Sequence, residues 1–215
     1  MLVKFRRKSA DAEAASEISA GSEAADLVVP SGPFDIDDLP AEDDVPRVDL
    51  GSMLVAPGRD LELRLQVDED EEEVQAVVLA GPEGALELRA FAAPRGGDLW
   101  SEIRPRLAAD YAQRGGTATE REGRFGPELV CQVTVRTQDG RTGTQPSRVI
   151  GVNGSRWMLR ATLMGRPAQD DAAAAPWEEA IEQIVIRRGA QAMPVGAALP
   201  LAMPPREQLV ERPST

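Results

Sequence analysis

Short runs in which apolar and polar residues alternate constrain this chain more than any other feature. In residues 61–67, Leu61, Leu63, Leu65 and Val67 fall on one side and polar residues on the other. Alternation with a period of two is typical of a β-strand. Strands with one buried and one solvent-facing side usually belong to antiparallel sheets, so we expect such a sheet here.

The same pattern recurs between turn residues along most of the chain. The acidic residues 68–73 predict a hairpin loop after the first strand. Asp139-Gly140 and Asn153-Gly154 are turn signals, and the second pair is typical of a tight hairpin. Further strands are predicted at residues 74–80, 86–90, 129–135, 148–152 and 157–163.

Two stretches change to helical spacing. Asp98 is a predicted helix N-cap, and Gly115-Gly116 marks the expected end of that helix. Pro105 inside it is expected to kink the helix or delay its start, because proline lacks an amide donor. Pro176 is placed near the start of a second helix, where a missing donor does no harm. Each helix has an apolar stripe that includes a tryptophan.

The order of strands and helices predicts an α+β fold. We expect an antiparallel sheet of about six to eight strands with the two main helices on one face. The predicted division is a disordered arm at residues 1–46, a compact α+β domain at 47–189, and an extended proline-rich strap at 190–215.

The charge of the chain is concentrated in the predicted arm. Residues 1–8 carry four basic side chains, whereas residues 9–46 contain 11 acids and neither Lys nor Arg. Residues 9–33 contain few large apolar side chains, so they cannot bury enough surface to offset the entropy of ordering. Residues 35–46 interleave acids with Ile, Leu, Val and Pro. We therefore expect a mobile arm with a basic tip and an acidic stretch.

Missing residue types exclude much of enzyme chemistry. The sequence has no histidine and a single cysteine, Cys131. This removes Ser-His-Asp and Cys-His catalysis, histidine-ligated zinc and four-cysteine clusters. Neither GxxxxGK[ST] nor GxGxxG occurs, so we predict no nucleotide cofactor and no enzyme activity. No long apolar run or secretory leader is present, which favours a cytoplasmic protein.

Several local phrases carry a family resemblance. They are Gly32-Pro33-Phe34-Asp35, Asp49-Leu50-Gly51-Ser52, the segment 153–160, and Met193-Pro194 followed by Leu199-Pro200-Leu201. Together they resemble the actinobacterial domain-of-unknown-function 3710 family over about residues 30–204. The resemblance implies a cytoplasmic bacterial protein and carries over no catalytic residue. By fold analogy alone, the order of elements is also similar to the PsbP-like α/β sandwich.

The acidic stretch supplies the candidate binding residues. Blocks of like charge are often interaction tails, so these acids are predicted to bind a basic protein partner. Simple solvation of the chain is the alternative interpretation of the same residues. The candidates are Asp35, Asp37, Asp38, Glu42, Asp43 and Asp44.

Other candidates have a simpler structural explanation. Cys131 is expected to be a buried core residue, because free cysteine behaves as a small apolar side chain. The acids of 68–73 are interpreted as a solvated loop rather than a calcium or magnesium site, since the spacing of a calcium loop is missing. Residues 1–8 are interpreted as a fraying terminus.

A nucleic-acid-binding face is a further hypothesis. Arg148, Arg156 and Arg160 with Trp157 combine the side chains that stack on bases. Residues 47–215 carry more acids than bases, however, so no nucleic-acid binding is expected. All three tryptophans of the sequence are instead assigned to the core.

Three functions remain open at this level. The leading prediction is a non-enzymatic protein-binding or scaffold module that uses its acidic arm and its sheet surface. The alternative is a carboxylate-based, metal-assisted hydrolase or lyase, whose acids the fold would have to bring together. A small-ligand carrier is the third, and it requires a pocket between sheet and helices.

Overall fold

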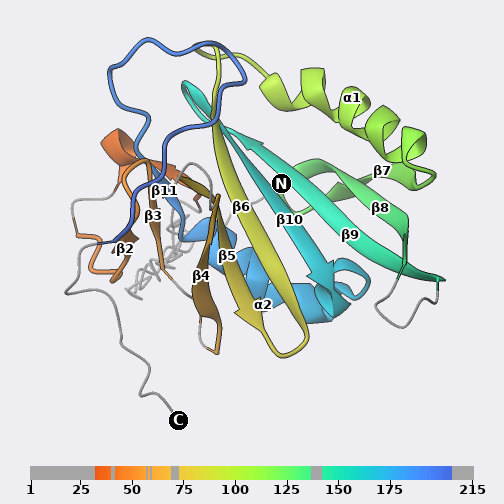
Figure 1. The fold of residues 1–215 in the computed structure, drawn as a ribbon. Coiled ribbons are helices and arrows are strands. Elements are labelled where there is room, and N and C mark those ends of the chain that lie inside the picture. The colour runs from red at the N-terminus through yellow and green to blue at the C-terminus, as the bar shows by residue number, and fades with distance from the viewer. Residues whose placement is uncertain are drawn as a thin grey trace, which may run out of the picture. The chain divides into compact units, whose positions relative to one another are not determined.

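A seven-stranded antiparallel sheet forms the centre of the computed structural model, which describes residues 32–39, 42–56, 58, 60–68, 73–136 and 142–204. Its strand order is β4-β5-β6-β10-β9-β8-β7, and every neighbouring pair is antiparallel (Figure 1). The predicted α+β class and antiparallel sheet are confirmed. The strands are β4 (Glu62–Val67), β5 (Val74–Gly81), β6 (Gly84–Ala92), β7 (Thr117–Gly123), β8 (Gly126–Arg136), β9 (Thr142–Asn153) and β10 (Trp157–Gly165).

A smaller sheet of four short strands accompanies the large one. Its order is β1-β11-β3-β2, in which β1 runs parallel to β11 and the other pairs are antiparallel. The strands are β1 (Phe34–Asp35), β2 (Val48–Asp49), β3 (Met53–Val55) and β11 (Val185–Ile186). Two short 3-10 helices are also present, η1 (Ile36–Asp38) and η2 (Arg166–Ala168).

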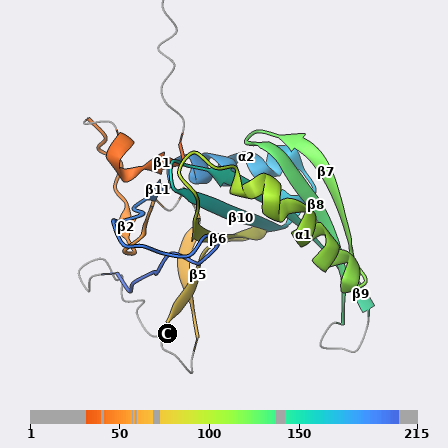
Figure 2. The same cartoon turned by 90° about the horizontal axis from the view of Figure 1, so that it is seen from above.

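The two α-helices lie on opposite faces of the large sheet, which corrects the expectation that they share one face. The helix α1 (Leu99–Gln113) packs on β7, β8 and β9, and α2 (Asp171–Glu182) packs on the other side (Figure 2). The physical reason is visible in adjacent residues of β9, because Val149 is buried under α1 and Ile150 under α2. The face that carries α1 is called the α1 face below, and the other the α2 face.

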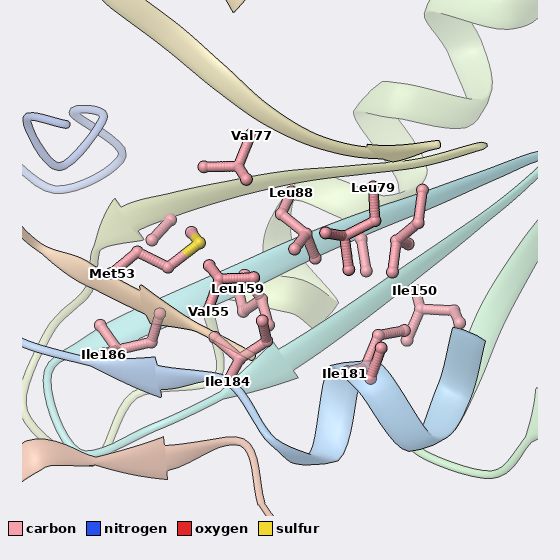
Figure 3. Packing of buried hydrophobic residues seen from close by; sticks show 14 of the residues in the cluster. Met53, Val55, Val77, Leu79, Leu88, Ile150, Leu159, Ile181, Ile184 and Ile186 are labelled. Atoms are coloured by element: carbon pink, nitrogen blue, oxygen red, sulfur yellow. The ribbon is translucent and has the colours of Figure 1, made fainter. Parts of the chain in front are cut away.

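The larger core lies on the α2 face, where the large sheet meets α2 and the small sheet. Each large side chain that is fully buried there contributes about 1.5–3 kcal/mol of stability. Side chains of the large sheet point towards Ile181 of α2 and towards the strands of the small sheet (Figure 3). They include Leu79, Leu88, Ile150 and Leu159.

A second, smaller core lies under α1. It contains Trp100, Leu129, Cys131 and Met158. The other two tryptophans belong to the larger core, so all three are buried as predicted.

Both internal prolines are accommodated inside continuous helices. Pro105 lies within α1, which begins directly after its cap Asp98, and Pro176 is the sixth residue of α2 rather than near its start. Each proline and the residue four positions before it are exposed. The carbonyl group that loses its helical donor therefore lies on the solvent side, where water satisfies it.

The first and last described segments are both attached to the fold. In β1, the Phe34 amide donates to the Ile184 carbonyl at 2.9 Å, so this strand of the small sheet falls inside the segment predicted to be an arm. Residues 190–204 run along the end of β6, where the Leu199 amide donates to Ala90 at 2.8 Å. Among the residues described, no helix combines the length and apolar character needed to cross a bilayer.

Candidate functional site

A cleft opens on the α1 face where the helix leaves the sheet uncovered. The helix lies over β7–β9, so the strands β10 and β6 continue beyond its edge (Figure 1). The cleft has a volume of about 370 Å³, and its walls come from α1, β6, β8, β9 and β10. That volume is at the lower end of the range for small-molecule sites. We call it the α1 cleft.

The N-terminal half of α1 is fixed to the end of β9. The Asp98 carboxylate caps the helix by accepting from the Ser101 amide at 3.0 Å, as the sequence predicted. Asn153 donates to Asp98 at 2.7 Å and accepts from the Trp100 amide at 3.2 Å. A β-carbon at Gly151 would overlap the Trp100 ring, so glycine at this position allows the helix to approach the sheet. The helix that forms one wall of the cleft is therefore held firmly in place.

The C-terminal half of α1 supplies polar groups to the cleft. The Tyr111 hydroxyl lies 3.2 Å from the Ser147 hydroxyl of β9. The guanidinium of Arg114 stacks over the Tyr111 ring, 4.8 Å from its centroid. Arg114 is the C-cap of the helix, and the next residue, Gly115, adopts a positive φ of 74°, as expected at a helix end. Hydroxyl and guanidinium donors therefore line this end of the site.

Two arginines stand side by side on the sheet wall. Arg160 of β10 and Arg89 of β6 are directly paired across the strands, and their guanidiniums lie over the Phe91 ring, at 5.3 and 5.8 Å from its centroid. Glu87 is 3.7 Å from Arg160, and no other described carboxylate forms an ion pair with it. Burial lowers the pKa of Arg160, and the positive charge of Arg89 lowers it further.

The Arg89 side chain is also incompletely satisfied. Its Nε atom is buried and has no hydrogen-bond partner among the described residues. Buried donors are nearly always paired in native proteins. The Nε atoms of Arg104, Arg148 and Arg188 share this state, so what distinguishes Arg89 is its position beside a second arginine. Like charges placed directly opposite each other in a sheet are also destabilising. The arginine pair is therefore a local excess of positive charge within an acidic chain.

The α2 face carries a different arginine cluster. Arg148 of β9 is 1% exposed and contacts Glu128 at 3.2 Å. It also contacts Asp171 at 3.3 Å and Glu178 at hydrogen-bonding distance. Arg121 binds Glu128 and Asp171, each at 2.6 Å, and these hydrogen bonds raise the pKa of Arg121. Three carboxylates thus converge here, and guanidiniums occupy the space between them.

The predicted partner-binding acids divide into two groups. Asp35 accepts hydrogen bonds from Ser155 at 2.7 Å and from the Trp157 indole at 3.0 Å. Partial burial raises the pKa of Asp35, but its hydrogen bonds outweigh that effect and the pKa is lowered. Asp43 forms a bidentate pair with Arg47 at 2.8 and 3.0 Å. The other four acids are exposed; they are Asp37, Asp38, Glu42 and Asp44.

The single cysteine is a core residue, as predicted. Cys131 is fully buried, and desolvation raises the pKa of its thiol to about 11, despite a hydrogen bond with Tyr111. A thiol with a raised pKa is seldom ionised at neutral pH and is a poor nucleophile.

The remaining sequence candidates have separate outcomes. Arg148 and Arg160 lie on opposite faces of the sheet, so they do not form one surface with Trp157. Residues 1–8, 69–72 and the turn at 139–140 lie outside the described residues. In the part of the chain that is described, no three His, Cys, Asp or Glu side chains are grouped closely enough to hold a metal ion.

Sequence reasoning did not identify the α1 cleft. Arg160 was considered only as part of a nucleic-acid face, and Arg89 was one polar residue in an alternating strand. The sequence feature that pointed towards the cleft was that both arginines occupy polar positions of predicted strands. They are distant in sequence and become neighbours only because β6 pairs with β10.

The fold and the cleft together define a class of protein. It is an α+β protein with a seven-stranded antiparallel sheet, a helix on each face and a polar cleft beside one helix. The chain belongs to the DUF3710 family, described as proteins of unknown function, and the family model matches residues 32–209. Membership of this family, which the sequence resemblance implied, is thereby confirmed. No curated protein matches the chain.

Proposed function

We propose that the protein is a non-enzymatic binding module and that the α1 cleft is its ligand site. The observation that carries this proposal is the lining of the cleft, which combines the Tyr111 and Ser147 hydroxyls with the guanidiniums of Arg114 and Arg160. Sites for small ligands commonly place a few polar groups on a partly apolar wall. This lining supports the small-ligand version of the binding hypothesis.

The chemistry of the described residues favours binding over turnover. The sequence contains no histidine, and the one thiol is buried with a raised pKa. Metal-assisted carboxylate chemistry would need free acids, and the strongest group is Glu128, Asp171 and Glu178. Each of those acids already forms an ion pair with the guanidinium of Arg121 or Arg148.

A fragment screen on the full chain tests this proposal. Backbone amide signals in two-dimensional NMR are expected to shift at Ser147, Arg160 and Thr162 when fragments bind, because these residues line the cleft. Thr162→Trp fills the cleft and is expected to abolish those shifts. If bound fragments never shift the amide signals of residues that line the cleft, the proposal is contradicted.

A matched control separates filling of the cleft from a general effect of an added indole. Thr119→Trp places the same side chain at an exposed position of β7. The strand partner of Thr119 is Val130, which in turn pairs with Arg148 of the α2 face. Thr119→Trp is therefore expected to leave fragment binding unchanged. Equal binding to Thr162→Trp and to the unmodified chain would also contradict the proposal.

We also propose that the exposed acids contact a basic protein partner. Asp37, Asp38, Glu42 and Asp44 are exposed, whereas the other two candidates bond within the fold. Replacing the four exposed acids by their amides is expected to lose partners captured by crosslinking in cells. Unchanged capture would assign these residues to solvation alone.

A further inference from the structure

We propose that the ligand of the α1 cleft carries a carboxylate or phosphate group, which binds to the guanidiniums of Arg160 and Arg89. This inference rests on the proposed function, since it names the class of ligand for the same cleft. Arg160 lines the cleft, and Arg89 is its direct cross-strand partner. The anionic group is thus expected at the β6–β10 side of the site.

The first argument is the positive charge that the fold compensates only in part. Arg89 and Arg160 are held together over one aromatic ring, and Glu87 at 3.7 Å is the one described carboxylate paired with Arg160. Arg148 on the other face shows that this chain can surround a buried arginine with acids. An arrangement that breaks a stability rule with only partial local compensation is typical of a functional site.

The second argument is geometric. A guanidinium presents its donors as a planar fork that matches the oxygens of carboxylate and phosphate. The buried Nε of Arg89 lacks a hydrogen-bond partner among the described residues. An oxyanion between the two arginines would reduce their mutual repulsion and supply acceptors to both.

The third argument concerns the rest of the ligand. Leu107, Val149 and Met164 give the cleft an apolar wall, and the Tyr111 hydroxyl adds a neutral donor. The volume of about 370 Å³ suits a small molecule rather than a folded partner. The expected ligand is therefore a small anion with a short apolar body.

Four probes test the inference on the full chain: hexanoate, hexyl phosphate, inorganic phosphate and hexanol. We expect at least one of the two anionic hexyl probes to bind in the cleft about tenfold more tightly than hexanol, measured by NMR titration. Preference for hexanoate supports a carboxylate ligand, and preference for hexyl phosphate supports a phosphate ligand. Binding of inorganic phosphate alone contradicts the apolar part of the proposal.

Variants separate the role of the arginines from a general effect of charge. Arg160→Gln and Arg89→Gln are each expected to weaken binding of the preferred probe about tenfold. Arg160→Lys should weaken it less, because lysine keeps the charge but loses the fork. Arg64→Gln is the matched control, since Arg64 is an exposed arginine of β4 paired with Glu62.

The outcomes distinguish this inference from the proposed function. Hexanol binding as tightly as both anions, with no effect of Arg160→Gln, would overturn the inference and leave the proposed function intact. If no probe binds, the inference fails whatever the fragment screen shows.

Discussion

Arg148 and Arg160 lie on opposite faces of the same sheet and have opposite environments. Arg148 is 1% exposed and is surrounded by three carboxylates, whereas Arg160 is 22% exposed, lies beside another arginine and has Glu87 at 3.7 Å. Burying a charge is tolerated only when it is paired and hydrogen-bonded. On the α2 face the charge of Arg148 is paired with acids, although its Nε atom, like that of Arg89, has no hydrogen-bond partner among the described residues. On the α1 face two arginines share one acid, Glu87. The difference favours a structural role for the first arginine and a ligand-binding role for the second.

The largest effect is expected from Arg148→Met. This change leaves the buried Glu128 with a single guanidinium, that of Arg121, and removes the partner of Glu178. Breaking a buried ion pair from one side costs about 3–5 kcal/mol, so the free energy of unfolding should fall by that order. Urea denaturation measures it. If the free energy of unfolding falls by less than about 1 kcal/mol, Arg148 is no more structural than a surface arginine, and the contrast with Arg160 is wrong.

A smaller, pH-dependent effect is expected from Asp171→Asn. The hydrogen bond from Arg121 lowers the pKa of Asp171, so the folded state favours the charged carboxylate. Its contribution is present above the ordinary pKa near 3.8 and is lost as pH falls through the lower folded value. Because Asp171 is largely exposed, the stability difference at neutral pH should be less than about 1 kcal/mol. Denaturation curves at neutral and acidic pH check this, and a difference that grows with acid would contradict it.

The smallest effect is expected from Arg160→Met. Removing this guanidinium relieves its repulsion with Arg89. It also takes away the ion-pair partner of Glu87, but Glu87 is partly exposed and can be solvated by water. The free energy of unfolding should therefore change by no more than about 0.5 kcal/mol in either direction. The same urea experiment compares it with Arg148→Met. Destabilisation similar to that of Arg148→Met would show that both arginines are structural.

Much of the local structure could be predicted because it depends on neighbouring residues. The strand at 61–67, the cap at Asp98 and the end of α1 at Gly115 follow from alternation, side-chain capping and backbone freedom. The hairpin at Asn153 was also predicted. Its strands pair from Asn153 and Met158 onward, so the connection is longer than a tight two-residue turn.

The failures involve residues whose partners are distant in sequence. The helices were expected on one face because the alternating strands indicated a sheet with one buried and one solvent-facing side. Instead, α1 and α2 cover adjacent residues of β9, Val149 and Ile150, from the two sides. Phe34 was included in the predicted arm because composition does not reveal its pairing with β11, near the other end of the chain.

Partner binding by the acids of residues 35–44 stays a prediction.

The sequence by itself determined the α+β class, the positions of most strands and the lack of histidine chemistry, since these depend on residue type and short-range spacing. Only the tertiary structure decided which charges meet. Strand pairing brings Arg89 beside Arg160 and places Arg148 among acids from β8 and α2, because contacts across a sheet depend on register and not on closeness along the chain.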